Sequence, residues 1–260
     1  MLQTVLADKL EYHEEAGNAQ VAKNIGGECI ERGDVMLIYS RPEFESGLNF
    51  ACRIRTDGAH IDKLIDDLCV WFESRGATPQ FRVSPLSRPP NVAQILERRG
   101  WVCNEHETQM VLEGEDTEPP TNPRVSVGIV SSNELEKFVT LQHLAFGGTG
   151  TPSPTIIKMA RASFDSGIST PYVAHIDGEF AGAGSLVNWA GVFGIYGVAT
   201  SENARGQGVA TAMVRRMIHD VRARGDAPIC LQAETGANTQ RWYERMGFRV
   251  VYDRTGWKKQ

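Results

Sequence analysis

A glycine-rich turn at residues 205–210, with the sequence RGQGVA, is the stretch of the chain that most directly indicates chemistry. It comes between a strand-like run at 193–199 and an amphipathic run that begins at Ala210. A strand, a glycine-rich turn and a helix amino terminus form an anion site, because free backbone N–H groups and the positive end of the helix dipole meet there. Gly206 and Gly208 would let phosphate oxygens approach the backbone. The turn therefore predicts a phosphate-bearing ligand.

Features that the sequence lacks narrow the class of ligand. The turn has no G-K-[ST] ending, and no G-x-G-x-x-G follows an early strand, so nucleoside triphosphates and dinucleotides are less natural ligands. The cysteines are odd in number, widely spaced and never arranged as C-x-x-C, so we predict neither a zinc site nor a disulfide framework. We expect reduced, mostly buried thiols at Cys29, Cys52, Cys69, Cys103 and Cys230.

Three motifs in a fixed order resemble the GNAT acetyltransferase superfamily. Its pyrophosphate loop has the pattern [RQ]-x-x-G-x-[GA], which Arg205, Gly208 and Ala210 match. Residues 198–200 (VAT) take the place of the family's preceding strand, and residues 242–248 (WYERMGF) look like its Y-E-x-x-G-F ending. The resemblance covers roughly residues 125–256.

The resemblance implies acetyl-CoA as the cofactor and no metal. It implies that backbone and side chains of Val198, Ala199, Thr200, Arg205, Gly206, Gln207, Gly208, Val209, Ala210, Thr211 and Asn238 bind it. Asn238 stands five positions before Tyr243, whereas family members often place an asparagine further from the tyrosine.

The resemblance also implies direct attack of a neutral amine on the thioester. The oxyanion that forms needs a fixed donor, and the backbone N–H of Val198 is the candidate. The departing thiolate needs a proton, and Tyr243 is the candidate general acid, because a tyrosine hydroxyl can donate as charge develops on sulfur.

The general base is open. Many relatives use a glutamate or an ordered water on the strand before the loop, but residues 193–199 contain no acid. Glu234 and Glu179 are possible bases, and His143 and His175 titrate in a suitable range. Trp189 and the GGTGTP loop at 147–152 could line a pocket for the acceptor. Glycine, threonine and proline are also common in turns that have no binding role.

Periodicity predicts the elements that position these residues. One apolar stripe follows Gly208 and predicts a helix packed on a sheet, with Arg215, Arg216, His219 and Arg222 outside the stripe. The stripe consists of Ala210, Met213, Val214, Met217, Ile218 and Val221. A buried strand at 228–233 and a helix at 238–246 follow, and the pair Asp177-Gly178 predicts a hairpin turn.

The first half shows a similar order of elements. A striped helix at 61–72, a strand at 80–83 and a helix capped by Asn91 repeat the pattern, with a strand expected at 49–54 before them. Residues 55–60 lack the phosphate-loop pattern, so this half is not expected to bind coenzyme A. We predict an α/β protein with two GNAT-like domains, each a twisted mixed sheet flanked by helices.

A proline-rich, acidic stretch between the halves predicts an exposed linker. We therefore expect a degenerate GNAT-like domain at 1–114, a linker at 115–124 and an acyl-CoA-binding domain at 125–260.

Net charge and the distribution of apolar residues limit the kinds of partner that the protein can bind. The net charge is -5 over 260 residues, which argues against a nucleic-acid surface. No stretch of ~18 apolar residues and no apolar run at the amino terminus occurs, so we expect a cytoplasmic protein without a membrane partner.

The function that these features predict is an acetyl-CoA-dependent N-acetyltransferase acting on a small-molecule or protein amine. Two alternatives stay open: a coenzyme A-binding sensor or scaffold without catalysis, and a transferase that uses a longer acyl donor. The sequence leaves the acceptor and the oligomeric state open.

Overall fold

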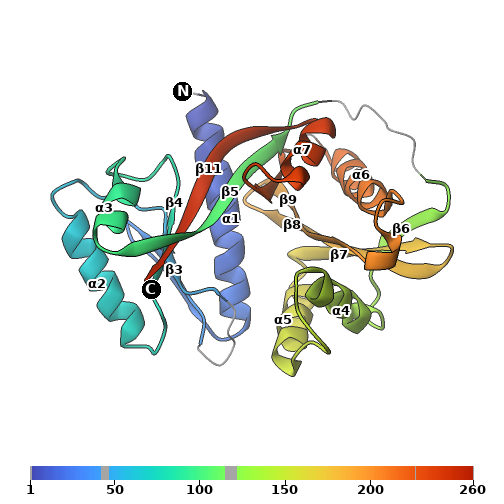
Figure 1. Ribbon diagram of the computed structural model, residues 1–260, viewed down its shortest axis with the longest axis horizontal. Helices are drawn as coiled ribbons and strands as arrows, with labels where there is room; N and C mark the ends of the chain where they lie inside the picture. The colour runs from blue at the N-terminus through green and yellow to red at the C-terminus, as the bar shows by residue number, and fades with distance from the viewer. Residues whose placement is uncertain (1, 42–46, 115–121, 226, 260) are drawn as a thin grey trace. The chain divides into compact units, whose positions relative to one another are not determined.

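The computed structural model describes residues 2–41, 47–114, 122–225 and 227–259 (Figure 1). The chain divides into two compact units. The first unit consists of Met1–Met110, Gln232–Glu244 and Arg249–Gln260, and the second of Val111–Leu231 and Arg245–Phe248.

The first unit is a mixed sheet with helices on both faces. Its strands follow the order β1-β2-β3-β4-β11-β5. β3 and β4 are parallel, with Ala51 opposite Phe81, whereas β11 runs antiparallel to β4, with Gly256 opposite Arg82. The elements are α1 (Leu2–Asn24), β1 (Glu28–Glu31), β2 (Met36–Tyr39), β3 (Phe50–Cys52), α2 (Ile61–Glu73), β4 (Gln80–Val83), α3 (Val92–Arg98), β5 (Trp101–Leu112), α7 (Asn238–Arg245) and β11 (Phe248–Lys259). Val111, Leu112, Arg245 and Phe248, at the ends of three of these elements, fall in the second unit.

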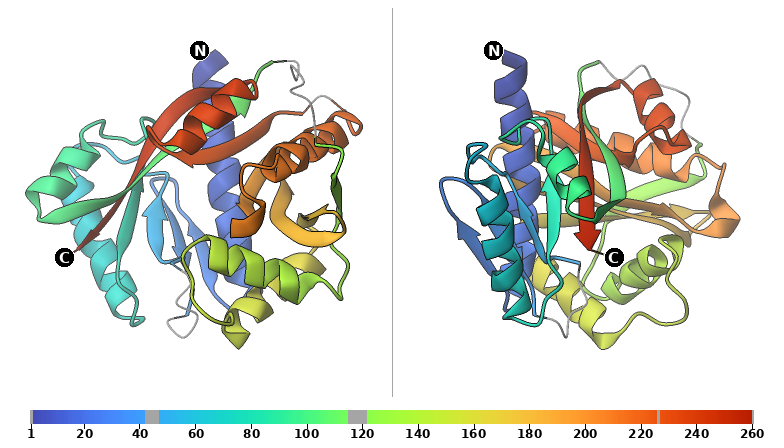
Figure 2. Two further views of the ribbon diagram at one scale, coloured as in Figure 1. Left: turned by 45° about the vertical axis from the view of Figure 1, so that its right-hand side comes forward. Right: turned by 60° about the vertical axis from the view of Figure 1, so that its left-hand side comes forward.

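Alternation along β2 builds a core on each face of this sheet, because successive side chains of a strand point to opposite faces. Met36 and Ile38 pack with the alanines of α1, and Leu37 packs in a cluster with residues of α2 and α3. Figure 2 shows α1 and α2 on opposite faces of these strands.

The second unit has the strand order β10-β9-β8-β7-β6. Its neighbours are antiparallel except for β9 and β10, which are parallel. Helices α4 and α5 cover one face and α6 covers the other (Figure 1). The elements are β6 (Val125–Ile129), α4 (Leu135–Ala145), α5 (Pro154–Asp165), β7 (Ser169–Ile176), β8 (Glu179–Trp189), β9 (Val192–Thr200), α6 (Val209–Arg222) and β10 (Ile229–Glu234), whose residues from Gln232 on fall in the first unit.

The elements expected near the site are present. β9, α6, β10 and α7 fall where the sequence predicts them, and so do α2 and β4 in the first unit. Asp177 and Gly178 form the expected hairpin turn between β7 and β8, with φ of 51° and 85°.

Three expectations need correction or addition. Arg215 is buried, with 8% of its surface exposed, although it falls outside the apolar stripe. Asn91 occupies the position before α3, but its side chain makes no capping hydrogen bond. Helix α1 was not predicted, because it buries Glu11 and Glu15 as well as alanines, so no apolar stripe marks it.

The compact units do not follow the predicted domain boundaries. Residues 115–121 of the predicted linker lie outside the described residues. The segments Gln232–Glu244 and Arg249–Gln260, expected in the second domain, belong to the first unit. The division of the sequence at 115–124 stays a prediction.

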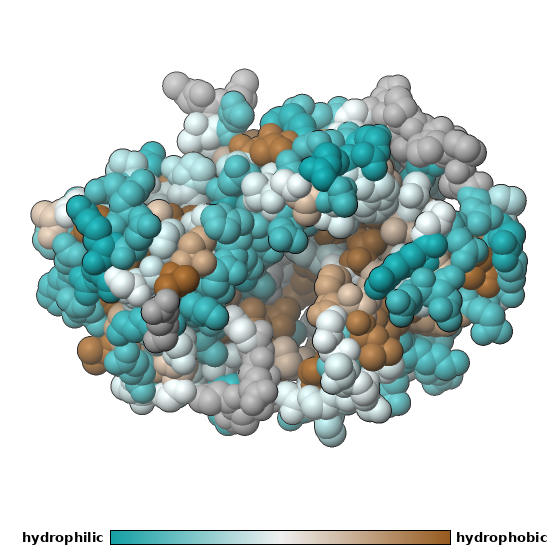
Figure 3. Space-filling model, viewed as in Figure 1, coloured by the Kyte–Doolittle hydropathy of each residue, from teal (hydrophilic) through white to brown (hydrophobic). Residues whose placement is uncertain are grey.

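The face seen in Figure 3 is mostly polar, with small separate hydrophobic patches. Within the part of the chain that the structure describes, no helix has both the length and the apolar composition to span a bilayer. The five cysteines are free thiols, and Cys52, Cys69 and Cys230 are buried, as expected.

Candidate functional site

A β-bulge in β9 lies at the candidate oxyanion donor. Ala183 of β8 pairs with Ala199 of β9, but Ser185 pairs with Tyr196, so the register shifts between them. The extra residue of β9 falls at Gly197 and Val198, and Gly197 has a φ of +59°. Such a bulge bends a strand and turns backbone groups away from the regular ladder.

Gln142 of α4 holds this bulge. Its Nε2 donates a hydrogen bond of 2.8 Å to the carbonyl oxygen of Gly197. That oxygen and the N–H of Val198 belong to the same planar peptide unit, so fixing one fixes the direction of the other. A Cβ on Gly197 would lie 2.4 Å from the Nε2 of Gln142, so glycine is needed here for the contact as well as for the backbone conformation.

β9 separates from its parallel neighbour before it reaches the bulge. The register between β9 and β10 pairs Phe193 with Ile229 and Gly194 with Cys230, and among the described residues it ends there. Val198, Ala199 and Thr200 come after this point, and β8 pairs with β9 up to Thr200. Backbone groups on the β10 side of β9 can therefore face a ligand instead of a strand.

The predicted phosphate turn follows β9 directly. A short 3-10 helix at Glu202–Ala204 leads to the exposed Arg205. Gly206 and Gly208 have φ of +75° and +81°, in the left-handed region that favours glycine. A Cβ on Gly206 would meet no heavy atom within 4 Å, so the space above it is open.

The amino terminus of α6 meets the requirements of an anion site. Val209 begins the helix, and its first turn, which includes Ala210 and Thr211, contains no acidic residue and no side-chain cap. The N–H groups of this turn are thus left for a ligand, at the positive end of the helix dipole. The side chain of Gln207 is held within the turn, donating to the carbonyl of Asn203 at 2.9 Å.

Asn122 supports the turn and was missed by the sequence reading. Its Nδ2 donates to the carbonyl oxygen of Gln207 at 2.9 Å, and a Cβ on Gly208 would lie 3.6 Å from its Cβ. It lies in the predicted linker, and Gln142 lies in an ordinary helix. No local pattern identifies either residue, because each acts on a segment far away in sequence.

The other two predicted site residues, Asn238 and Tyr243, lie on α7 in the first unit. Burial raises the pKa of Tyr243 to about 12, and the residue is 8% exposed. The Oδ1 of the exposed Asn238 accepts a hydrogen bond of 2.5 Å from Nη2 of Arg241. The structure thus brings 198–200 and 205–211 together in the second unit and places these two residues in the other.

The candidate bases lie in four separate places. Glu234 and Glu179 are exposed at the end of β10 and the start of β8. Nε2 of His143 lies 3.2 Å from the carbonyl oxygen of Thr149 in the 147–152 loop. Nε2 of His175 lies 3.9 Å from Oε1 of Glu134, and its ring packs edge-on against Phe180.

The corresponding place in the first unit is closed. Arg53 follows β3 with a φ of +51°, as Gly197 does within β9 with +59°. Here the next carbonyl, that of Ile54, accepts a hydrogen bond of 2.9 Å from the N–H of Arg88, and Arg55 forms a parallel bridge with Arg88. A segment of the protein thus pairs with the backbone that would have to face a cofactor.

The model of the acetyltransferase (GNAT) family matches residues 137–248. None of the curated proteins matches the chain.

Solved structures are similar over most of the chain. A GCN5-related N-acetyltransferase from Kribbella flavida has a TM-score of 0.70 at 16% identity, over 95% of each chain. One from Sphaerobacter thermophilus has 0.64 at 18%, over 90% of this chain and 75% of that one. A tandem GNAT protein from the clavulanic acid biosynthesis pathway has 0.62 at 12%, over 86% and 77%. The predicted α/β fold class is confirmed: the acetyltransferase (GNAT) family model matches residues 137–248, and the fold is similar to those of solved GNAT structures over most of the chain.

Proposed function

We propose that the protein transfers an acetyl group from acetyl-CoA to an amine. The observation that supports this most is the sequence of features on β9 and α6: a bulge held by Gln142, a register with β10 that ends at Gly194 among the described residues, and an open glycine turn at a helix amino terminus. A long, partly apolar molecule with a phosphate group fits such an edge followed by such a turn.

Acetyl-CoA fits the residues present. Backbone groups of Val198, Ala199 and Thr200 would pair with its pantetheine arm, and residues 205–211 would hold its pyrophosphate, with Arg205 adding a positive charge. When bound, the cofactor supplies an acetyl group activated as a thioester.

The protein's own groups would then perform two tasks. The N–H of Val198 would donate to the carbonyl oxygen as negative charge develops there. The hydroxyl of Tyr243 would donate its proton to the departing sulfur. The proton that the amine loses would go to water or to one of the candidate bases, such as Glu234 or Glu179, and water would return a proton to Tyr243.

A cavity beside the bulge is a place for the acceptor. It has a volume of about 140 Å³ and is lined in part by Gln142 and by Ser185, the register partner of Tyr196. Its remaining lining contains no charged side chain. A small uncharged substituent of the amine would fit there.

We do not propose a cofactor for the first unit, because the N–H of Arg88 pairs with the carbonyl of Ile54 where a cofactor would have to insert. The cytoplasmic location, acetyl as the acyl group and the division at 115–124 are parts of the proposal that come from the sequence alone.

The experiment that tests the proposal is calorimetric titration with acetyl-CoA. We expect the wild-type protein to bind it and Gly208→Glu to lose binding by more than about tenfold, because a carboxylate there repels the pyrophosphate. Gly167→Glu is the matched control: Gly167 also has a positive φ of +68° and open space around it, and it lies in the turn after α5. Absence of binding by folded wild-type protein would reject the proposal.

A further inference from the structure

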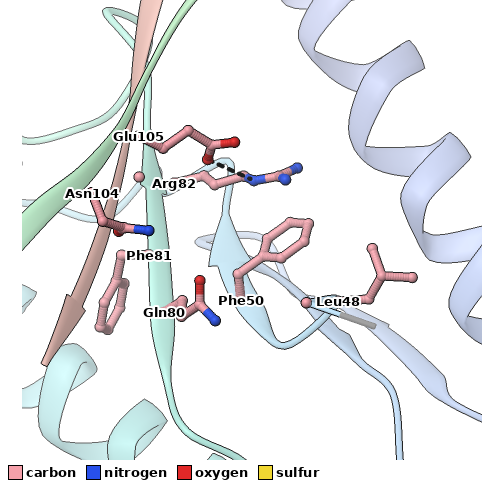
Figure 4. A pocket seen from close by; sticks show the side chains of 9 residues that line it. Leu48, Phe50, Gln80, Phe81, Arg82, Asn104 and Glu105 are labelled. Atoms are coloured by element: carbon pink, nitrogen blue, oxygen red, sulfur yellow. Dashed lines mark ion pairs between the residues drawn. The ribbon is translucent and has the colours of Figure 1, made fainter. Parts of the chain in front are cut away.

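The first unit contains a cavity of about 330 Å³ that has no part in the proposed transfer (Figure 4). Its polar lining comes from β4, β5 and β11: Gln80 and Arg82, Asn104 and Glu105, and the backbone of Gly256. Phe50 of β3 forms part of its apolar wall. The volume lies at the lower end of the range of ~300–1,000 Å³ that small-molecule pockets occupy.

The positive charge at this cavity is that of Arg82, which is paired within the protein. The guanidinium of Arg82 stacks over the ring of Phe50, 3.9 Å from its centroid. Its Nη1 lies 3.2 Å from Oε2 of Glu15, whose side chain is 1% exposed. The charge of Arg82 is therefore paired with a buried carboxylate, so Arg82 does not make the cavity an anion site.

The negative charge is less well satisfied. Oε2 of Glu105 lies 3.8 Å from Nε of Arg82, which is an ion pair beyond hydrogen-bond distance. The Glu105 side chain is 33% exposed. A Cβ at position 256 would lie 2.7 Å from its Oε2, so Gly256 leaves the room that this carboxylate occupies. Glu105 keeps acceptor capacity toward the cavity.

Two amides complete the polar lining. The side chains of Gln80 and Asn104 make no hydrogen bond within the described part of the chain. Figure 4 shows both amides among the residues that line the cavity, with the Glu105 carboxylate directed toward Arg82. Each amide offers both donors and an acceptor, so the pair suits hydroxyl or amide groups of a ligand.

We propose that this cavity binds a small primary amine that also has hydroxyl or amide groups. The ammonium pairs with Glu105, and the neutral polar groups bond to Gln80 and Asn104. The volume of about 330 Å³ lies within the range of small-molecule pockets, so a molecule of the size of an amino sugar is a suitable ligand. None of the residues that line the cavity is among those proposed to bind acetyl-CoA or to transfer its acetyl group.

Calorimetry with two probes of nearly equal size tests the proposal, using the full chain without acetyl-CoA. Glucosamine provides the ammonium and glucose does not. We expect glucosamine to bind and glucose to bind at least about tenfold more weakly, because a hydrogen bond to a charged group is stronger than a neutral one. Glu105→Gln should remove this preference for the amine.

Glu97→Gln is the matched control, because Glu97 is an exposed glutamate of α3 outside the cavity lining. It should bind glucosamine as the wild type does. A second, site-specific measurement is the NMR signal of the Gln80 and Asn104 side-chain amides, which should shift with glucosamine in the wild type. The proposal is overturned if folded wild-type protein binds no glucosamine, if Glu105→Gln binds it equally well, or if neither amide signal moves.

Discussion

Tyr243 is the proposed general acid, and its surroundings bear on that role. Burial raises its pKa to about 12 from a usual value of ~10, because the ionised phenolate loses hydration. A raised pKa means that the hydroxyl stays protonated up to higher pH than an exposed tyrosine does. The residue is therefore present as a protonated hydroxyl at neutral pH, which is the form that a general acid needs.

Replacing Tyr243 by phenylalanine should lower kcat by ~10²-fold or more, while the affinity for acetyl-CoA stays within about twofold. The wild-type kcat should show no decrease from tyrosine ionisation below about pH 10, since the folded-state pKa lies above that value. Steady-state kinetics across pH, together with calorimetric binding, measure both effects. Tyr252→Phe is the control, because Tyr252 is also 8% exposed in the first unit and has no proposed catalytic role.

Unchanged kcat in Tyr243→Phe would assign the proton transfer to another group. Tight binding of acetyl-CoA by the wild type, with no turnover on any amine, would favour the alternative of a sensor or scaffold.

At the scale of secondary structure, the bulge of β9 and helix α4 act together. α4 forms an ordinary core with its apolar face, which includes Phe138 and Val139. Gln142 reaches from the same helix to Gly197, 55 positions away. The peptide that presents the Val198 N–H is therefore held by an element other than its own strand.

Gln142→Ala should lower kcat by roughly tenfold and change the KM for acetyl-CoA by less than about twofold. The lost hydrogen bond frees the Gly197–Val198 peptide to rotate, which weakens a contact needed mainly in the transition state. Leu144→Ala on the same helix is the control, because Leu144 is 51% exposed. An increase in KM with unchanged kcat would show that Gln142 acts in binding and not in positioning the oxyanion donor.

At the scale of the whole molecule, the last strand of the chain belongs to the first unit. The family match ends at Phe248, where β11 begins, and β11 then pairs with β4. Arg254 of β11 is 6% exposed and lies 3.1 Å from Oε1 of Glu15 on α1. It also pairs with Glu107 of β5, so one guanidinium connects α1, β5 and β11.

Arg254→Met should destabilise the protein by about 3–5 kcal/mol, because Glu15 would remain as a buried charge with one partner fewer. Urea denaturation followed by circular dichroism measures the loss. Arg98→Met, at an exposed arginine of α3, should change the free energy of unfolding by less than about 0.5 kcal/mol. Equal effects of the two substitutions would contradict the importance of the buried pair.

The sequence by itself determined the features that depend on near neighbours along the chain. The glycine turn at 205–210, the helix after Gly208, the hairpin at Asp177 and the fold class could all be predicted. Each follows from the conformational preferences of glycine, from turn chemistry or from an apolar stripe, and these act within a few residues.

Tertiary structure alone decided the contacts that join distant segments. Gln142 to Gly197, Asn122 to Gln207, and Arg254 to Glu15 connect residues 55, 85 and 239 positions apart. The same is true of α1, whose buried glutamates hide its helical pattern, and of β11, which is placed in the first unit by its pairing with β4. Such contacts depend on which surfaces meet when the chain folds, and no local preference of the residues involved specifies them.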